Sequence, residues 1–250
     1  CLTFDPDLLI LLDQSEHNLF KIERECEGSK HPVSFQPILG DIRDKTLLQR
    51  VFSSFNPDVV FHAAAYKHVP MQEDHPWEAI LTNIQGTLNL IDSSEEYNVN
   101  RFVLVSTDKA VNPTNIMGAT KRVAEKLIQS KSIDSNVKFM AVRFGNVIGS
   151  SGSVIPTFQE QIRNGGPITI TNPNMQRYFM SISEAAQLIL QAGAMGSGGE
   201  IYVLDMGKPV NIQDIAYELI RLSGLEPETD IGIEYIGMRP GEKMYEELQT

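Results

Sequence analysis

Short apolar segments alternate with longer amphipathic segments through the first 108 residues. The apolar segments are LLILLD, VSFQPILGD, DVVFHAAA and RFVLVSTD, at residues 8–13, 33–41, 58–65 and 101–108. They are rich in Val, Ile, Leu and Phe and lack polar alternation, so they suit parallel strands that helices cover on both faces. The pattern therefore predicts an α/β fold built on a doubly wound parallel sheet.

Three positions carry the signals of helix starts. Ser15 precedes an acidic residue, Asp44 follows the segment DIR, and Pro76 precedes WEAI. A side-chain oxygen can accept from a free N–H group of the first helical turn, and proline has the backbone angle φ of a helix already fixed. We therefore expect helices to begin close to these three residues.

The composition changes after residue 145, where Gly, Asn and Pro separate short elements. We predict a dinucleotide-binding Rossmann part over residues 1–145. A smaller substrate-binding region is expected over 146–250, partly interleaved with the first part. No linker separates the two.

A dinucleotide-binding fold opens with a strand, a glycine-rich turn and a helix that holds the pyrophosphate at its N-terminus. No GxGxxG motif occurs in this sequence, and its beginning, CLTFDPDLLILLD, resembles the end of that first helix running into the second strand. We therefore expect the first strand and its glycine-rich turn to be supplied by residues that precede this sequence. In the usual strand order, 3-2-1-4-5-6, that strand is central.

Charge and cysteine content narrow the class of protein. The formal net charge is −11 and no basic run occurs, which argues against a nucleic-acid partner. The two cysteines, Cys1 and Cys26, cannot form a disulfide framework and favour a reducing cytoplasm. No apolar run approaches the roughly 20 residues of a membrane span, so we expect a soluble region whose residues do not contact a membrane.

Several residues at the ends of the first strands are candidates for binding a dinucleotide. Asp13 is placed to bind the adenosine ribose hydroxyls, which favours NAD over NADP, although capping the helix near Ser15 explains it equally well. Small residues at the end of the third apolar segment would let a cofactor backbone approach closely. The candidate cofactor-binding residues are Asp13, Asp41, Ile42, Ala63, Ala64, Ala65 and Lys121.

The segment STDKAVNPTNIMGATKR, residues 106–122, carries the candidate chemistry. Its first four residues leave a predicted strand at the carboxyl edge of the sheet, where ligands bind in such folds. Met117 and Lys121 are four residues apart and share one face of the following helix. His62 is expected to be a buried strand residue, since no second ligand stands at metal-binding spacing, and we predict no metal site.

These residues resemble a known family. The chain is similar to extended short-chain dehydrogenases/reductases, and within them to the UDP-N-acetylglucosamine 4,6-dehydratases of polysaccharide biosynthesis. Met117 stands where that family usually has Tyr, which resembles its long, membrane-anchored members. The motifs that carry the likeness are FHAAAYKHVPMQE, TNIQGTLNL, STDKAVNPTNIMGATKR, VRFGNVIGSSGSVIPTFQEQI, MQRYFMSISEA and RPGEKMYEEL.

The resemblance implies an internal redox cycle on a UDP-sugar. Hydride leaves sugar C4 for NAD, water is eliminated across C5 and C6, and the hydride returns to C6. Lys109 would be the base for the C5 proton, which requires a neutral amine, and Asp108 the acid for the O6 hydroxyl. Met117 carries no ionisable proton, so it cannot accept the proton of the C4 hydroxyl. Thr107 and Lys121 remain candidates for handling this proton, and Ser106 would position the reacting groups.

The resemblance also implies contacts with the nucleotide sugar, since arginine matches phosphate geometry. Turn and surface roles are the simpler alternatives for these residues. The implied substrate-binding residues are Lys67, Asn146, Arg177, Arg239 and Glu242.

Two other functions stay open at this point. A UDP-sugar 4-epimerase shares the C4 oxidation, and a non-catalytic dinucleotide sensor would fit the missing Tyr and glycine-rich turn. Residues 108 and 109 favour elimination.

A homo-oligomer paired through helices 77–97 and 115–131 is compatible with either enzyme. The expected location is the cytoplasm, or the cytoplasmic side of an anchored protein.

Overall fold

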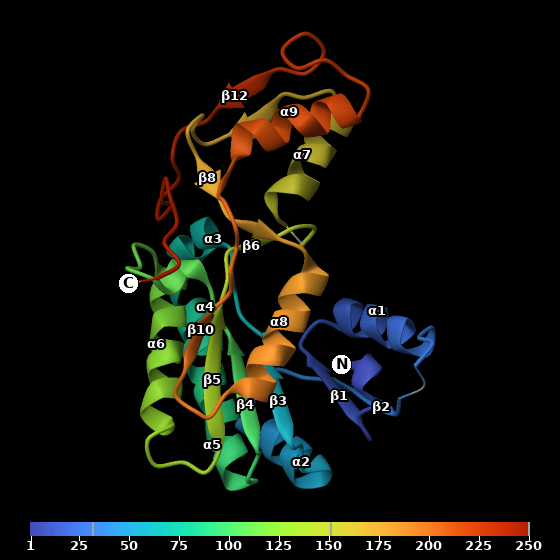
Figure 1. Ribbon diagram of the computed structural model, residues 1–250, viewed down its shortest axis with the longest axis vertical. Helices are drawn as coiled ribbons and strands as arrows, with labels where there is room; N and C mark the ends of the chain where they lie inside the picture. Colours follow the sequence, from blue (N-terminus) through green and yellow to red (C-terminus); the bar gives the residue numbers. More distant parts are fainter. Residues whose placement is uncertain (32, 151, 250) are drawn as a thin grey trace.

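The protein has two lobes, which Figure 1 shows one above the other. The computed structural model describes residues 1–31, 33–150 and 152–249. The lower lobe is built on a four-stranded parallel sheet in the order β10-β5-β4-β3. These strands are β3 (Val59–His62), β4 (Arg101–Val105), β5 (Lys138–Arg143) and β10 (Ile201–Val203).

Helices bury both faces of this sheet, as the apolar segments predicted. On β4, Phe102 and Leu104 belong to one core cluster with α2, α5 and α6, whereas Val103 belongs to a second cluster with α8. Alternate residues of a strand point to opposite faces, so both faces of β4 are buried. On β3, by contrast, Val59 and Phe61 are exposed. The helices of this lobe are α2 (Lys45–Phe55), α3 (Val69–Asp74), α4 (Pro76–Ala79), the π-helix η2 (Ile80–Gly86), α5 (Thr87–Glu96), α6 (Ile116–Lys131) and α8 (Ile182–Met195).

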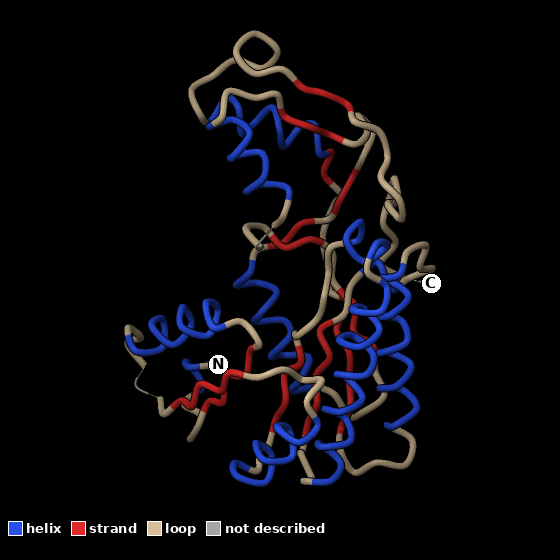
Figure 2. Tube along the Cα trace, turned by 180° about the vertical axis from the view of Figure 1, so that it is seen from behind, coloured by secondary structure: helices blue, strands red, loops and turns tan. Residues whose placement is uncertain are grey.

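A separate parallel pair lies beside the main sheet. It consists of β1 (Leu9–Asp13) and β2 (Phe35–Leu39), with α1 (Glu16–Glu27) between them in the chain and a short 3-10 turn, η1 (Leu2–Phe4), before them. Seen from behind in Figure 2, the pair stands to the side of the four-stranded sheet. Within the described residues, β1 pairs only with β2 and β3 only with β4. A strand between β1 and β3, as the usual strand order would have it, is not among the described residues and stays a prediction.

The predicted helix starts are confirmed. The Ser15 side chain accepts from the N–H of Asn18 at the start of α1, and the Asp44 side chain accepts from Leu47 at the start of α2. Pro76 is the first residue of α4.

The upper lobe has its own core. It is lined by Phe158, Ile162, Ile168, Ile170 and Ile220, among others. Its elements are β6 (Asn146–Val147), α7 (Val154–Arg163), β7 (Ile168–Ile170), β8 (Gln176–Arg177), β9 (Phe179–Met180), β11 (Val210–Asn211), α9 (Ile212–Leu222) and β12 (Ile233–Tyr235). Since α8 and β10 return to the lower sheet, the chain after residue 146 builds part of both lobes.

A buried carboxylate attaches α6 to the ends of β4 and β5. Glu125 is fully buried and accepts one hydrogen bond from Ser106, two from Arg143 and one from Arg122, all between 2.7 and 2.9 Å. Burial alone would raise the pKa of Glu125, but these hydrogen bonds hold it below its ordinary value. The stabilisation is therefore present above the ordinary carboxyl pKa and is lost as the pH falls through the lowered value.

The substitution Glu125→Ala should destabilise the protein by about 3–5 kcal/mol, because it leaves the guanidinium of Arg143 buried without its partner. Urea unfolding at neutral pH measures this difference. The matched control is Glu96→Ala, an exposed residue at the end of the neighbouring helix α5, which should change stability by less than about 0.5 kcal/mol. Equal effects of the two substitutions would contradict the assigned role of Glu125.

Candidate active site

The loop after β4 is fixed to β5 by its backbone. The N–H of Ser106 donates to the carbonyl of Val142 at 2.7 Å, and the N–H of Asp108 donates to the carbonyl of Phe144 at 3.0 Å. Thr107 then caps the 3-10 turn η3 (Asp108–Ala110). The segment predicted to carry the chemistry therefore leaves the carboxyl edge of the sheet in a defined conformation.

Two of its side chains point into the protein. The hydroxyl of Ser106 donates to Glu125 and is buried. Asp108 is also fully buried; its Oδ1 accepts from the Thr107 hydroxyl and from the Lys109 amine, both at 2.9 Å. Its Oδ2 has no hydrogen-bond partner among the described residues. We expected Asp108 to face a reacting group directly, but its carboxyl group lies beneath Thr107 and Lys109.

The Lys109 side chain lies above Asp108 and is surrounded by oxygen atoms. Its Nζ donates to Asp108 at 2.9 Å and to the Asn146 amide oxygen at 3.4 Å. A second carboxylate oxygen, Oε1 of Glu246, lies 3.6 Å away. The amine is thus held at the meeting point of β4, β6 and the C-terminal segment.

Helix α6 approaches this loop closely because it begins with a cap and a glycine. The Asn115 side chain accepts from the N–H of Gly118 at 2.7 Å. A Cβ atom on Gly118 would stand 2.2 Å from the carbonyl oxygen of Lys109, a distance that no larger residue tolerates. Glycine at this position lets the first turn of α6 rest directly on the Lys109 backbone.

Met117 and Lys121 face the same cavity from α6. Met117 is buried at 2% exposure, in line with apolar packing. The Lys121 amine donates to the carbonyl of Val105 at 2.9 Å. Burial lowers the pKa of Lys121 to about 8, although the negative charge of Glu125 acts in the opposite direction.

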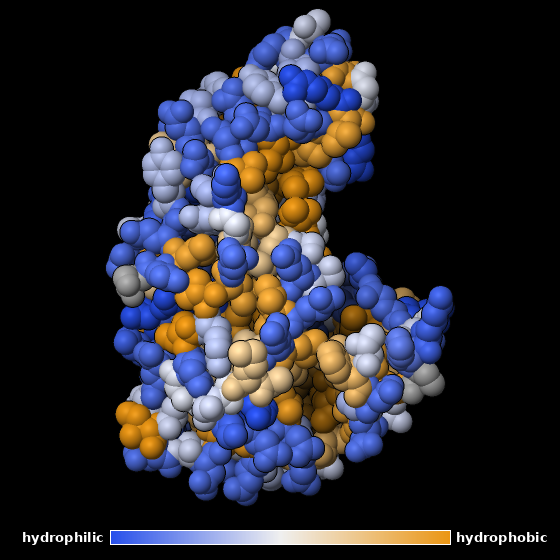
Figure 3. Space-filling view, viewed as in Figure 1, coloured by the Kyte–Doolittle hydropathy of each residue, from blue (hydrophilic) through white to orange (hydrophobic). Residues whose placement is uncertain are grey.

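A cavity of about 780 Å³ brings most of the candidate residues together between the lobes. Figure 3 shows the molecule hollowed between the upper lobe and the part formed by β1, β2 and α1, with apolar side chains in the hollow. Asp108 does not line this cavity. The candidate residues that do are Ala63, Ala65, Lys67, Ser106, Thr107, Lys109, Lys121, Asn146, Arg177, Arg239 and Glu242.

The guanidinium groups of the two candidate arginines differ in burial and in their protein partners. The guanidinium of Arg177 is buried and donates to the carbonyls of Gln176, Lys243 and Met244, so it attaches the C-terminal segment to β8. The guanidinium of Arg239 is half-exposed and pairs with Glu242 at 2.6 Å. Arg239 is the more available of the two for an anionic ligand.

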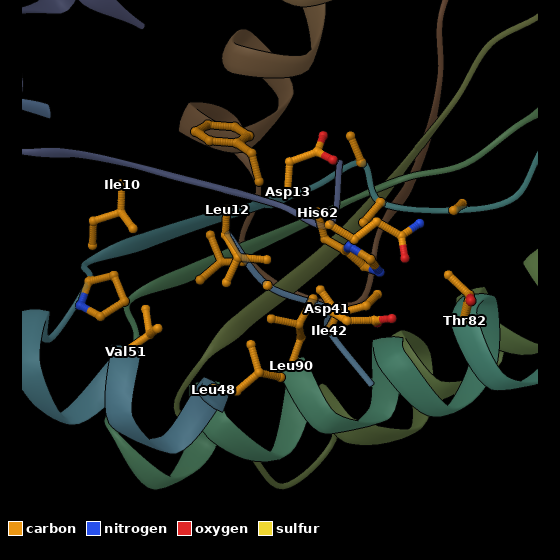
Figure 4. Close-up of a pocket in the computed structure, with 18 of the residues that line it drawn as sticks. Ile10, Leu12, Asp13, Asp41, Ile42, Leu48, Val51, His62, Thr82 and Leu90 are labelled. Atoms are coloured by element: carbon orange, nitrogen blue, oxygen red, sulfur yellow. The ribbon is translucent and has the colours of Figure 1, made fainter. Parts of the chain in front are cut away.

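A second cavity, of about 480 Å³, lies between β1 and β3. Figure 4 shows Ile10, Leu12 and Asp13 on one side of it, with Leu48 and Leu90 on the opposite side. Ala63 and Ala65 line both cavities, so the two adjoin at the end of β3. The candidate residues that line the second cavity are Asp13, Asp41, Ile42, Ala63, Ala64 and Ala65.

The two candidate carboxylates of this second cavity, Asp13 and Asp41, already have protein partners. Asp13 accepts from the N–H of Ser15 at 2.7 Å, at the entrance of α1. Asp41 accepts from the backbone and guanidinium of Arg43. Burial would raise the pKa of Asp41, but the hydrogen bonds from Arg43 hold it below its ordinary value. Ile42 is buried against the bare backbone of Gly86.

His62 is a buried strand residue, as expected. It is 2% exposed, its Nε2 lies 2.8 Å from the Thr87 hydroxyl, and burial lowers its pKa to about 3. Over residues 1–31, 33–150 and 152–249, no group of three or more His, Cys, Asp or Glu side chains could hold a metal ion. In the same ranges, no helix combines the length and apolar character needed to cross a bilayer.

Sequence reasoning missed the groups that support the site. Glu125 and Arg143 carry no recognisable signal, since an acid within a helix is normally solvent-exposed. Glu246 stands next to Glu247 in a segment without hydrophobic periodicity, so the sequence does not indicate which of the two acids is buried. Their packing against segments distant in sequence decides both cases.

The fold and the residues at its edge define an extended short-chain dehydrogenase/reductase. The chain belongs to the polysaccharide biosynthesis protein family, whose model matches residues 1–250.

Relatives with curated names support this membership. The chain is 56% identical to the capsular polysaccharide biosynthesis protein CapD of Staphylococcus aureus over 98% of its length, but spans only 41% of that protein. It is 38% identical to an inverting UDP-N-acetylglucosamine 4,6-dehydratase of Campylobacter jejuni, covering 97% of this chain and 70% of the relative. A UDP-glucose 4-epimerase of Rickettsia rickettsii is also 38% identical, over 84% of this chain and 60% of the relative.

Among solved structures, that of Pen from Bacillus thuringiensis is 39% identical to this chain. The two structures align with a TM-score of 0.91, and the alignment covers all of this chain and 76% of the Pen chain. The Rossmann-like architecture predicted from the sequence is thereby confirmed.

The lowered pKa of Lys121 has a measurable consequence for stability. Between about pH 8 and the ordinary lysine pKa of about 10.4, the unfolded chain holds more protons at this residue than the folded one, so stability rises with pH. Between pH 7 and pH 10 this contribution amounts to about 2–3 kcal/mol and should be missing in Lys121→Met. Urea unfolding at pH 7 and pH 10 measures it.

The control for this experiment is Lys126→Met, an exposed lysine on the same helix. The stability difference between this control and the wild type should not change with pH. If the difference for Lys121→Met also stays constant from pH 7 to pH 10, Lys121 titrates normally and the electrostatic description of the site is wrong.

Proposed function

We propose that this chain is the catalytic region of a nucleotide-sugar 4,6-dehydratase. It would convert UDP-N-acetylglucosamine to a UDP-4-keto-6-deoxy-N-acetylhexosamine for bacterial surface polysaccharide or glycan synthesis. The observation that carries the proposal is the position of Lys109, which lines the same cavity as Lys121 and has the buried carboxyl group of Asp108 2.9 Å behind its amine. The family and the 4,6-dehydratase relative support the same reaction.

The two adjoining cavities fit a nicotinamide dinucleotide. Asp13 and Asp41 stand at one end and Lys121 at the other, with the small side chains of Ala63 and Ala65 between them. The negative charge of Asp13 would repel a 2′-phosphate, which favours NAD over NADP. When bound, NAD supplies the acceptor for the C4 hydride and the donor for its return to C6.

Lys109 would remove the C5 proton once C4 is a ketone. Its amine reaches the cavity, and the contact with Asp108 allows a proton to pass between the two groups. Asp108 would exchange protons with Thr107 and Lys109, but its own carboxyl group does not line the cavity, so the proton for the O6 hydroxyl would reach the sugar through a group that does.

The C4 hydroxyl needs another proton acceptor, since a thioether at position 117 offers none. Thr107 has a hydroxyl at the cavity wall that is hydrogen-bonded to Asp108. It can relay the C4 proton, while the Lys121 amine, next to the same wall, would stabilise the developing negative charge. Ser106 would have a positioning role, because its hydroxyl donates to Glu125 and so fixes the loop after β4 to α6.

The nucleotide would be held by the residues around the upper part of the cavity. Arg239 offers a half-exposed guanidinium for the pyrophosphate, with Glu242 fixing its orientation. Arg177, Lys67 and Asn146 complete the polar wall. In a chain with a net charge of −11, these groups offset the repulsion of a dianionic ligand.

The runner-up activity is 4-epimerisation, which the Rickettsia relative supports. An epimerase needs only the C4 oxidation and its reversal, so it has no use for the Lys109–Asp108 pair beside the cavity. A non-catalytic sensor has no use for this pair either.

We also infer a homo-oligomer of the full-length protein. Trp77, Leu81 and Val123 are large apolar side chains exposed on α4, η2 and α6, and the first of them is 72% exposed. The exposed apolar positions lie on the helices expected to pair with a second copy. For location, we propose the cytoplasmic side of the membrane.

The proposal is tested by incubating the full-length protein with NAD and UDP-N-acetylglucosamine in deuterated water. We expect a 4-keto-6-deoxy product with deuterium at C5, detected by NMR. Lys109→Ala should lower its formation by about 10²- to 10⁴-fold, the range for loss of an acid–base group. Met117→Leu, which preserves side-chain volume, should retain most of the turnover.

Three outcomes would count against the proposal. Inversion at C4 without loss of water would favour the epimerase. An unchanged sugar in the presence of bound NAD would favour the sensor. A larger loss from Met117→Leu than from Lys109→Ala would overturn the assignment of the proton transfers.

A further inference from the structure

A carboxyl group from the C-terminal segment enters the wall of the larger cavity. Residues 236–249 return from the upper lobe to the lower one, ending beside α6 (Figure 1). Backbone carbonyls of this segment accept hydrogen bonds from Asn115 and Arg177, and the Lys243 amine donates to the carbonyl of Val111. Both lobes therefore fix the position of Glu246.

The Glu246 side chain is buried and incompletely paired. It is 3% exposed, and its Oε1 lies 3.6 Å from the Lys109 amine and 3.9 Å from Nε of Arg177, both beyond hydrogen-bond distance. Its Oε2 is buried and has no hydrogen-bond partner among the described residues. A buried polar atom without a partner is unfavourable, and a ligand hydroxyl or a bound proton would offset this cost.

The surroundings of Glu246 favour its protonated form. Burial raises its pKa, the positive charges of Lys109, Arg177 and Lys243 act against this, and the negative charge of Asp108 adds to it. The net result is a raised pKa, as a general acid requires.

Glu246 and Asp108 differ in access to the cavity. Both carboxyl groups stand next to the Lys109 amine, but Glu246 lines the cavity and Asp108 does not. Of the two acids beside Lys109, only Glu246 contributes to the cavity wall.

We propose that Glu246 is a further catalytic residue of this site, which delivers a proton to the departing O6 hydroxyl group. This inference rests on the proposed dehydratase activity. The C5–H bond breaks and its proton moves to the Lys109 amine, the C6–O6 bond breaks, and O6 leaves as water with the Glu246 proton. A C5–C6 double bond forms with no net oxidation. When the hydride returns to C6, Lys109 gives a proton back to C5, and the proton that the C4 hydroxyl released on oxidation restores the acid form of Glu246 through solvent.

The isosteric substitution Glu246→Gln tests this role in the full-length protein with NAD and UDP-N-acetylglucosamine in deuterated water. We expect formation of the 4-keto-6-deoxy product to fall by about 10²-fold or more. Reduced nicotinamide absorbance should still appear, and recovered substrate should still acquire deuterium at C5, because Lys109 is intact. A merely structural role of Glu246 would remove all three signals together.

The matched control is Glu247→Gln, the same change at the adjacent, half-exposed acid, which should leave all three signals unchanged. Unfolding midpoints of both variants check their folding, and Glu246→Asp should restore part of the product. The inference is overturned if Glu246→Gln makes product within threefold of wild type, or if it loses nicotinamide reduction and C5 exchange along with product. If the wild type makes no product, the proposed function fails as well.

Discussion

The attachment of α6 to the ends of β4 and β5 is the constraint on which the rest of the site depends. The Glu125 carboxylate accepts hydrogen bonds from Ser106 at the end of β4, from Arg143 at the end of β5 and from Arg122 on its own helix. A carboxylate without water is tolerated only with such partners, so the three elements cannot separate without exposing a costly buried charge. Gly118 completes the attachment by letting α6 rest on the Lys109 backbone.

This attachment determines which side chains after β4 support the fold and which face the cavity. Ser106 turns inward to the support, whereas Thr107 and Lys109 face the cavity. Lys121, one helical turn before Glu125, enters the same cavity wall with its amine tied to the Val105 carbonyl. The cavity thus has two amines with different surroundings: Lys109 lies beside carboxylates, whereas Lys121 is buried and donates to a carbonyl oxygen. Different electrostatic surroundings give chemically similar groups different roles.

Local patterns predicted much of the fold. Unbroken apolar runs predicted strands buried on both faces, and Ser15, Asp44 and Pro76 predicted three helix starts, because these signals depend only on neighbouring residues. The sequence also predicted that residues 106–109 leave the edge of the sheet. It could not predict that Asp108 would be covered, since this depends on Thr107 and Lys109 folding over it. Glu246 was missed for a related reason, because its position depends on Lys109 in η3 and Arg177 in β8, which are far away in the chain.

The central claim is that Lys109 acts directly on the sugar. A crystal structure of the full-length protein with NAD and UDP-N-acetylglucosamine bound tests it most directly. We expect sugar C5 to lie within about 4 Å of the Lys109 amine, close enough for proton transfer. A sugar ring seated in the cavity with C5 too far from Lys109 to be bridged by one water molecule would contradict the account.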